Sequence, residues 1–218
     1  MELERFDEFD AYEEIPDEGQ KLLGTTWVLT EKVKAGEDIV KARLVVRGDQ
    51  EIKDDIETDS PTVRKGNIGM VLMLAARNSW RIKSQDVTCA FLQSSSINRD
   101  VFIRPPLEKR IPGVIWKLRK TVYGLVDASR GFYLNFSNHL LKFGCTKSKL
   151  DPAMFLYYED EDKDVKEPSG IAVMHVDDIM SAGEEGFETK VMDNMKSSFK
   201  FGSEEETISV SWYEHKSS

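Results

Sequence analysis

The sequence predicts an α+β fold, because short apolar strands and amphipathic helices follow one another without an internal repeat. Two apolar runs, residues 171–174 and 179–180, lie on either side of a tight turn and are expected to form a strand hairpin. Residues 67–78 and 128–143 carry apolar side chains at helical spacing. At 218 residues, with 40% hydrophobic and 32% charged residues, the chain can form one large domain or two small lobes.

The first predicted element is a hairpin. Residues 27–33 alternate between apolar and polar side chains, residues 35–38 supply a turn, and residues 39–47 return as a second strand. A period of two places Lys41 and Arg43 on one face of this hairpin. Two cations on one face either form a solvated edge or bind a phosphate group.

The next predicted elements lead to one isolated acid. The helix over residues 67–78 is followed by a strand that ends near Asp86, which is the only acid between Asp59 and Asp100. An acid at the C-terminal end of an inner strand is where sheet-based folds often bind ligands. Asp86 is therefore a candidate ligand-binding residue.

The middle of the chain is expected to supply a short strand over residues 101–104 and a longer strand over residues 115–122, which has one cationic face. The helix over residues 128–143 follows, and Gly144 is a typical cap for its C-terminus. His139 lies on the apolar stripe of this helix, where a core or rim histidine is the simplest interpretation.

The last third of the chain begins with a predicted strand over residues 154–158 and an exposed acidic loop over residues 159–167. After the apolar hairpin, residues 184–199 have the pattern of an amphipathic helix. Residues 200–218 begin like a strand and then become polar and irregular.

Two adjacent carboxylates, Asp177 and Asp178, lie at the turn between the two apolar runs. Charges between buried strands are costly unless they are partnered, most simply by a divalent metal. The alternative is an ordinary hairpin turn, because Asp favours turns by hydrogen-bonding to its own backbone. Taken alone, the pair favours the turn.

Charge is distributed unevenly along the chain, whose overall net charge is −9. Residues 1–20 carry nine acids against Arg5, and residues 1–24 are expected to be an acidic, disordered tail because they lack apolar periodicity. Residues 61–150 carry sixteen Lys and Arg against four acids, a net of +12. Such a block indicates a polyphosphate partner, although a solvated surface of mixed charge is the alternative.

Composition also excludes several classes of protein. Cys89 and Cys145 are too few for a disulfide framework and have no zinc-ligand spacing. No apolar stretch reaches 18 residues, and the N-terminus is acidic where a signal peptide would be basic. We expect an intracellular, soluble protein in a reducing compartment, either cytoplasmic or nuclear.

Five segments resemble, in the same order, the reverse transcriptases of Ty1/copia-type retrotransposons. These are KARLVVRG (41–48), QDVTCAFL (85–92), WKLRKTVYGL (116–125), DPAMF (151–155) and HVDD (175–178). The resemblance runs from about Trp27 to Gly202. It implies a polymerase palm, which is an RRM- or ferredoxin-like antiparallel sheet with helices on one face, together with a small fingers lobe. Residues 25–202 would form these parts, and residues 203–218 would be a truncated, irregular C-terminus.

The family implies an RNA-directed DNA polymerase that acts on an RNA or DNA template with a primer and uses dNTPs, with no membrane involvement. Asp86 and Asp177 match the carboxylates that hold two Mg²⁺ ions, for which Mn²⁺ can substitute, and Asp178 matches the third catalytic acid. Two metals can stabilise both the attacking 3′-oxygen and the leaving pyrophosphate.

The resemblance also implies a set of dNTP-binding residues. Lys41 and Arg43 match cations that would neutralise the triphosphate. Phe91 matches an aromatic residue that would exclude a 2′-hydroxyl, although a plain core aromatic is the alternative. Tyr123 and Gly124 match the motif that lines the nucleotide pocket.

The sequence departs from the family at three places. His175 replaces the usual Tyr beside Val176, in the vicinity of the primer grip. Asp127 and Ser129 replace a common Gln and Pro. Residues 203–218 do not continue into a recognisable thumb region or RNase H domain. The alternative to an active enzyme is therefore a truncated, catalytically silent remnant that at most binds nucleic acid.

Overall fold

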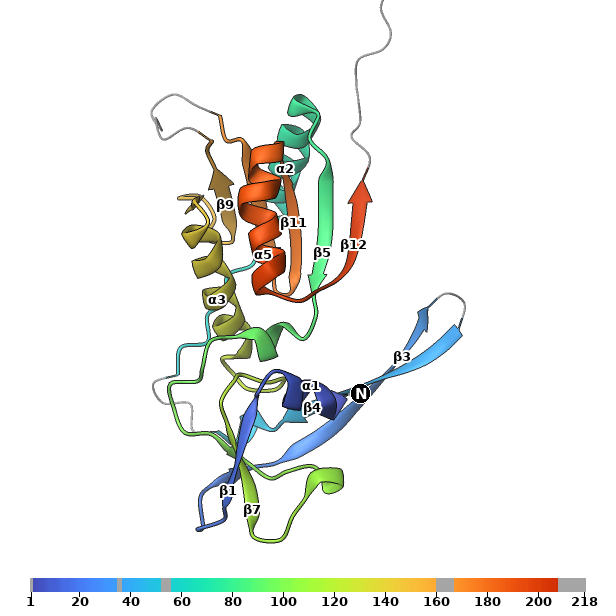
Figure 1. Cartoon of the computed structure of the whole chain (residues 1–218), viewed down its shortest axis with the longest axis vertical. Coiled ribbons are helices and arrows are strands. Elements are labelled where there is room, and N and C mark those ends of the chain that lie inside the picture. The colour runs from blue at the N-terminus through green and yellow to red at the C-terminus, as the bar shows by residue number, and fades with distance from the viewer. Residues whose placement is uncertain (1, 35–36, 52–55, 160–166, 208–218) are drawn as a thin grey trace, which may run out of the picture. The chain divides into compact units, whose positions relative to one another are not determined.

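The computed structural model describes residues 2–34, 37–51, 56–159 and 167–207 (Figure 1). The chain forms two compact units. The first unit comprises Met1–Asp59 and Cys89–Asn135, and the second unit comprises Ser60–Thr88 and Phe136–Ser218. Both units contain strands and helices, so the predicted α+β class is confirmed. No helix within the described ranges has both the length and the apolar character that a membrane span requires.

The first unit contains a four-stranded sheet and a separate hairpin. In the sheet, the strands lie in the order β1 (Tyr12–Pro16), β7 (Val114–Leu118), β6 (Phe102–Ile103) and β2 (Leu22–Leu23). The hairpin pairs β3 (Thr25–Lys34) with β4 (Glu37–Val46), as the sequence predicts. The unit also contains the short helices α1 (Glu2–Glu8), η1 (Gly48–Gln50), η2 (Ala90–Gln93) and η3 (Leu107–Lys109). Strand β7 ends at Leu118, before its predicted end at Val122.

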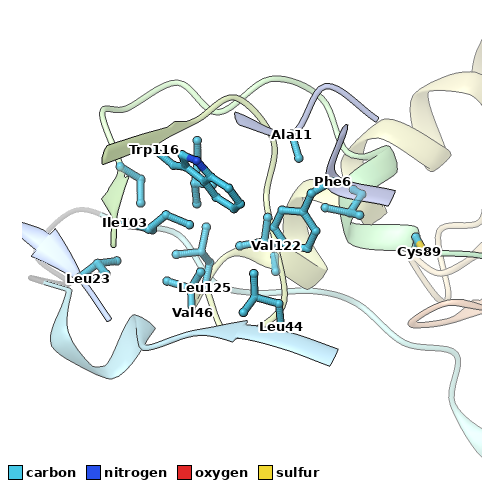
Figure 2. Packing of buried hydrophobic residues seen from close by; sticks show 14 residues of the cluster. Phe6, Ala11, Leu23, Leu44, Val46, Cys89, Ile103, Trp116, Val122 and Leu125 are labelled. Atoms are coloured by element: carbon cyan, nitrogen blue, oxygen red, sulfur yellow. The ribbon is translucent and has the colours of Figure 1, made fainter. Parts of the chain in front are cut away.

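The core of the first unit is built around Trp116 (Figure 2). The Tyr12 ring stacks on the indole with the ring centroids 3.7 Å apart, and Phe6 packs at 6.4 Å. Leu44 and Val46 of β4 enter the same cluster. Burial of these apolar side chains therefore fixes the base of the β3–β4 hairpin to the rest of the unit.

The structure corrects the expectation of a disordered tail over residues 1–24. Phe6 and Ala11 are fully buried, and β1 pairs with β7 from Tyr12 opposite Leu118 to Pro16 opposite Val114. The few apolar side chains of this acidic segment are buried against β7, and their burial outweighs the like charges around them. The prediction of disorder was wrong because composition and periodicity of residues 1–24 contain no information on the distant strand β7, against which these side chains pack.

The second unit is built on a six-stranded sheet. Its strands lie in the order β12 (Phe201–Thr207), β5 (Ile82–Val87), β11 (Asp178–Gly183), β10 (Gly170–His175), β9 (Met154–Tyr157) and β8 (Cys145–Lys147). The helices are α2 (Lys65–Asn78), α3 (Ala128–Lys142, which begins in the first unit), α4 (Glu185–Phe187), the π-helical turn η4 (Glu188–Met192) and α5 (Asp193–Ser198). The predicted helix over residues 184–199 is thus interrupted by a π-helical turn.

Strand β10 lies within this sheet, between β11 and β9, and its first five residues are all buried. Uniform burial means that both faces of the sheet are covered at β10. Phe187 packs directly on the backbone of the β10–β11 hairpin, because a Cβ atom at Gly170 would lie 2.2 Å from the Phe187 ring and one at Gly183 would lie 2.4 Å from it. The hairpin that carries the acidic turn is therefore held firmly in the sheet.

Two predicted irregular segments fall partly outside the described residues. Of the predicted loop over residues 159–167, residues 160–166 lie outside them. Of the C-terminal segment over residues 203–218, residues 208–218 lie outside them, whereas residues 203–207 belong to β12. The irregular structure expected from residue 203 onward is therefore wrong for residues 203–207.

Candidate active site

The turn between β10 and β11 carries the first part of the candidate site. His175 pairs with Asp178 across the hairpin, so Val176 and Asp177 form a two-residue turn. Val176 has a φ of 59°. This left-handed conformation is unusual for a β-branched residue and costs roughly 1–3 kcal/mol. Such strained residues cluster at functional sites.

Strand β5 brings Asp86 to the same end of the sheet. Asp86 lies opposite Asp178 in the antiparallel ladder, and the backbone N–H of Val87 donates to the carbonyl oxygen of Asp177 at 2.9 Å. Hydrogen-bonded and non-hydrogen-bonded pairs alternate along such a ladder, so the Cα atoms of Asp86 and Asp178 form a close pair, about 4.5 Å apart. Both side chains leave on the same face of the sheet. Backbone pairing thus joins two acids that are far apart in the sequence.

The arrangement of these acids favours a bound cation. Asp86 and Asp178 are exposed, and Asp177 is half-buried. Like charges directly opposite on neighbouring strands destabilise a sheet, and a counter-ion relieves this repulsion. No set of three or more His, Cys, Asp or Glu side chains in the described residues is arranged as a ready-made metal site. Mg²⁺ usually binds through one or two carboxylates and completes its shell with water and substrate phosphates, so the donor set fits this ion.

His175 and Val176 lie where the sequence places them, beside the acidic pair. His175 is exposed at the end of β10, after five buried residues. A contact of either residue with a primer stays a prediction.

Gly202 was not singled out from the sequence, yet it lies beside Asp86. A Cβ atom at Gly202 would lie 3.1 Å from Asp86 Oδ2 and 3.1 Å from Thr88 Oγ1. The only sequence signal was its place at the end of the family resemblance. Long-range pairing of β12 with β5 creates this contact, and periodicity does not reveal such pairing.

A second group of candidate residues lies within the first unit. The Arg43 guanidinium lies 5.6 Å from the centroid of the Tyr123 ring, and Phe91 meets Tyr123 edge-on with centroids 4.7 Å apart. Lys41 leaves β4 on the same face as Arg43. The structure therefore brings together Arg43, Tyr123 and Phe91. Phe91 also packs against the core cluster, so the core alternative for this residue has support.

Arg43 has an unusual environment. Its Nε atom is buried and has no hydrogen-bond partner among the described residues. A buried N–H group without an acceptor costs about 1–3 kcal/mol, and more on a charged side chain.

Gly124 positions β4 against the Tyr123 turn. It has a φ of 95°, and a Cβ atom there would lie 2.0 Å from the Val46 carbonyl oxygen. The Val46 N–H donates to the Tyr123 carbonyl oxygen at 2.8 Å, and a Cβ atom at Gly48 would lie 2.2 Å from the Gly124 carbonyl oxygen. Glycine is required at position 124 both by conformation and by space. Its observed role is to allow this close approach, and contact with a nucleotide stays a prediction.

Asp127, one of the departures from the family pattern, has a structural partner. Arg99 donates to both carboxylate oxygens of Asp127, at 2.5 and 3.1 Å, and to both of Glu51, at 2.9 and 3.2 Å. One cation thus bridges two acids from different loops of the first unit. The extra acid at position 127 is thus ion-paired with Arg99, although this one cation is shared with Glu51 and the three groups together keep a net charge of −1.

Acids of the N-terminal segment also pair with cations of residues 61–150, the basic block of the sequence. Arg119 donates to Asp10 at 2.7 Å and lies 3.3 Å from Glu13, and Lys109 donates to Asp7 at 3.2 Å. The acidic N-terminal segment therefore neutralises part of the predicted polyphosphate-binding surface within the first unit. The net charge of +12 counted along the sequence overstates the charge available to a ligand.

The two cysteines take no part in the site. Cys89 and Cys145 are buried and form no disulfide with each other. Burial raises the pKa of the Cys145 thiol to about 12, so this residue is not a nucleophile near neutral pH.

Comparison with known proteins identifies the family of the chain. Residues 11–209 match the family model described as reverse transcriptase (RNA-dependent DNA polymerase). Over 195 residues, the chain is 32% identical to the retrovirus-related Pol polyprotein from transposon RE1 of Arabidopsis thaliana, covering 85% of the chain and 13% of that protein. The Pol polyprotein from transposon TNT 1-94 of Nicotiana tabacum is 29% identical over 194 residues, covering 85% of the chain and 14% of that protein. The chain thus spans about an eighth to a seventh of the length of these relatives.

Proposed function

Since the chain belongs to the reverse transcriptase (RNA-dependent DNA polymerase) family of Ty1/copia-type elements, we propose that it performs RNA-directed DNA synthesis as part of a Pol polyprotein. The observation that carries this proposal is the pairing of Asp86 with Asp178 beside the turn at Val176 and Asp177, in which Val176 has a left-handed φ. Carboxylates gathered at one end of a sheet are suited to a hard divalent cation.

The second unit would be the palm, and the first unit would be the fingers, within a polymerase region over residues 25–202. The second unit supports this by its element order, because β5, α3, β10, β11, α5 and β12 follow the β-α-β-β-α-β pattern once β8 and β9, which extend the sheet beyond β10, are set aside. The spatial order β12-β5-β11-β10 is that of a ferredoxin-like sheet. The first unit supports it by presenting Lys41 and Arg43 on one face of a long hairpin.

The proposed reaction is nucleotidyl transfer. The primer 3′-oxygen forms a bond to the α-phosphorus of a dNTP, the bond from that phosphorus to the bridging oxygen breaks, pyrophosphate leaves, and the hydroxyl proton passes to solvent. Asp86, Asp177 and Asp178 would hold two Mg²⁺ ions. When bound, these ions would lower the pKa of the 3′-hydroxyl and neutralise charge on the leaving group.

The first unit would bind the nucleotide. Lys41 and Arg43 would pair with the triphosphate, which their placement on one face of β4 supports. Phe91 would pack against the sugar and discriminate against a 2′-hydroxyl. Its half-buried position against Tyr123 supports a fixed ring.

Primer extension on an RNA template tests the proposal. With Mg²⁺ or Mn²⁺, the chain is expected to incorporate dNTPs, and Asp177→Asn is expected to reduce the rate at least a hundredfold. Asp193→Asn, an exposed acid on α5, is the matched control and should leave the rate unchanged. Incorporation by the unaltered chain that does not exceed that of Asp177→Asn would contradict the proposal and favour a silent remnant.

A further inference from the structure

Strand β12 approaches β5 at the level of Asp86, and Gly202 is the residue of closest approach. A Cβ atom there would meet Asp86 Oδ2 and Thr88 Oγ1, each at 3.1 Å, and the Asp86 carbonyl oxygen at 3.4 Å. The first two distances are shorter than ordinary van der Waals contact. Any side chain at position 202 would therefore press on the carboxylate.

Conformation does not explain this glycine. Gly202 has no positive φ, so its backbone is open to any L-residue. Its surroundings do not enclose it, because the residue is exposed. The consequence of adding a methyl group here is thus confined to the contacts with Asp86 and Thr88.

The position of Gly202 is fixed by its neighbours in β12. The register of β12 against β5 shifts between Phe201 and Glu204, which is the signature of a bulge. Before the bulge, the Thr88 N–H donates to the Lys200 carbonyl oxygen at 2.9 Å. This hydrogen bond fixes the start of the bulge against the residues that follow β5.

Glu204 fixes the other end of the bulge by hydrogen bonds of its side chain. Its carboxylate accepts hydrogen bonds from Gln85 Nε2 at 2.6 Å and from Lys196 Nζ at 2.8 Å. Gln85 is 2% exposed, and it immediately precedes Asp86 in β5. The bulge therefore cannot move away from Asp86 without breaking contacts to β5 and α5.

We propose that Gly202 is a positioning residue, which leaves the Asp86 carboxylate the space to turn toward Asp178 and bind a divalent cation. The inference rests on the proposed function, because it assigns the metal to Asp86. Bulges beside active sites often redirect a side chain in this way. A residue that orients a metal ligand is expected to affect metal affinity more than stability.

Binding of Mn²⁺, measured by electron paramagnetic resonance on the full chain, tests this role. Gly202→Ala is expected to weaken binding roughly 3- to 10-fold, and Gly202→Val more strongly. The loss for Gly202→Ala lies at or below the lower end of the roughly 10- to 100-fold range that follows loss of an orienting partner, because the orienting contacts are crowded and not removed. Gly69→Ala is the matched control, since a Cβ there meets nothing within 4 Å, and it should leave affinity unchanged.

Primer extension adds a second readout. Raising the Mg²⁺ concentration should restore the rate of Gly202→Ala toward that of the unaltered chain, whereas Asp86→Asn should not recover. Thermal melting should show both Gly202 variants folded.

The outcomes separate the two proposals. If the unaltered chain binds Mn²⁺ through Asp86, and Gly202→Ala and Gly202→Val bind it equally well, the positioning role is overturned and the proposed function stands. If Asp86→Asn does not reduce Mn²⁺ binding, the metal assignment fails, and both proposals fail with it.

Discussion

The two units of the chain hold their candidate residues by different means. In the second unit, Asp86 and Asp178 lie in hydrogen-bonded strands of one sheet, and backbone register decides that they meet. In the first unit, Arg43, Tyr123 and Phe91 come from a hairpin, a turn and the segment at η2. Close packing holds these segments together, most tightly at Gly48 and Gly124. The position of the acids is therefore set by many backbone hydrogen bonds between β5 and β11. The position of Arg43 beside Tyr123 is set by a few close backbone contacts, which only glycine allows at Gly48 and Gly124.

The largest expected effect tests the packing of the first unit. Gly124→Ala adds a Cβ atom 2.0 Å from the Val46 carbonyl oxygen, at a φ of 95°. We expect it to lower the free energy of unfolding of the first unit by roughly 3 kcal/mol or more. Urea unfolding followed by tryptophan fluorescence, in a background where Trp27, Trp80 and Trp212 are replaced by Phe so that Trp116 is the reporter, measures this.

Gly113→Ala is the control for Gly124→Ala. It has a φ of 75°, but nothing lies within 4 Å of the added atom. It should therefore lose only the conformational term of about 1–2 kcal/mol. Equal losses at the two positions would show that close packing at Gly124 is not what holds β4 in place.

A somewhat smaller effect is expected at a buried acid in the second unit. Asp151 is 1% exposed, and it accepts hydrogen bonds from the N–H of Arg64 at 3.0 Å, the N–H of Ala153 at 2.9 Å and the Asn67 amide at 2.6 Å. Asp151→Ala leaves these donors without an acceptor and should cost roughly 2–3 kcal/mol of stability. Chemical denaturation measures this cost. A loss below about 0.5 kcal/mol would mean that β9 and the start of α2 are held without this residue.

Asp151 also predicts a dependence of stability on pH. Burial raises the pKa of Asp151, but hydrogen bonds from Arg64, Ala153 and Asn67 outweigh it and hold the pKa below its ordinary value of 3.8. A group with a lowered pKa in the folded state contributes stability above its unfolded pKa and loses it as pH falls through the folded value. Melting temperatures between pH 6 and pH 2 should therefore fall less steeply for Asp151→Asn than for the unaltered chain. A parallel fall would contradict this assignment.

A smaller effect is expected at the ion-paired loops of the first unit. Asp127→Gln keeps an acceptor for Arg99 and places the common family residue at this position, so it should cost less than about 1 kcal/mol. Asp127→Ala removes the acceptor from a partly buried cation and should cost about 1–2 kcal/mol. Urea unfolding of both variants checks the order. If Asp127→Gln destabilises the chain more than Asp127→Ala does, a neutral acceptor cannot replace the carboxylate, and the negative charge of Asp127 is needed to hold Arg99.

The smallest effect on stability is expected where the acidic segment meets the basic block. Arg119, Asp10 and Glu13 are exposed, and ion pairs between exposed side chains contribute little to stability because water and salt screen them. The double change Asp10→Asn and Glu13→Gln should leave stability nearly unchanged. It should, however, raise affinity for single-stranded RNA a few-fold and steepen its salt dependence, because Arg119 is released. An unchanged salt slope, measured by fluorescence anisotropy, would show that Arg119 does not contact nucleic acid.

Sequence reasoning predicted the elements that are set by local pattern. The hairpin around Asp177, the strand ending near Asp86 and the β3–β4 hairpin are all present, because each depends on alternation or an apolar run within a few residues. The five family segments also pointed to the candidate residues before any geometry was known.

Features set by long-range pairing were not predicted. The ordered N-terminal segment depends on β1 meeting β7, and the neutralisation of Arg119 by Asp10 joins residues that are 109 positions apart. The approach of Gly202 to Asp86 depends on a bulge in β12. Periodicity and composition describe one segment at a time, so they contain no information on which distant segments pair.

Metal-directed cleavage tests most directly whether register alone assembles the cation site. With added hydrogen peroxide and ascorbate, Fe²⁺ bound in place of Mg²⁺ reduces the peroxide to hydroxide and a hydroxyl radical, ascorbate returns Fe³⁺ to Fe²⁺, and the radical cuts the backbone nearest to the ion. Two cuts are expected, one near Asp86 and one near Asp177 and Asp178, and both should disappear with excess Mg²⁺ and in Asp86→Asn. Cuts at one of these segments without the other, or cuts that Mg²⁺ does not suppress, would contradict a shared metal site at this end of the sheet.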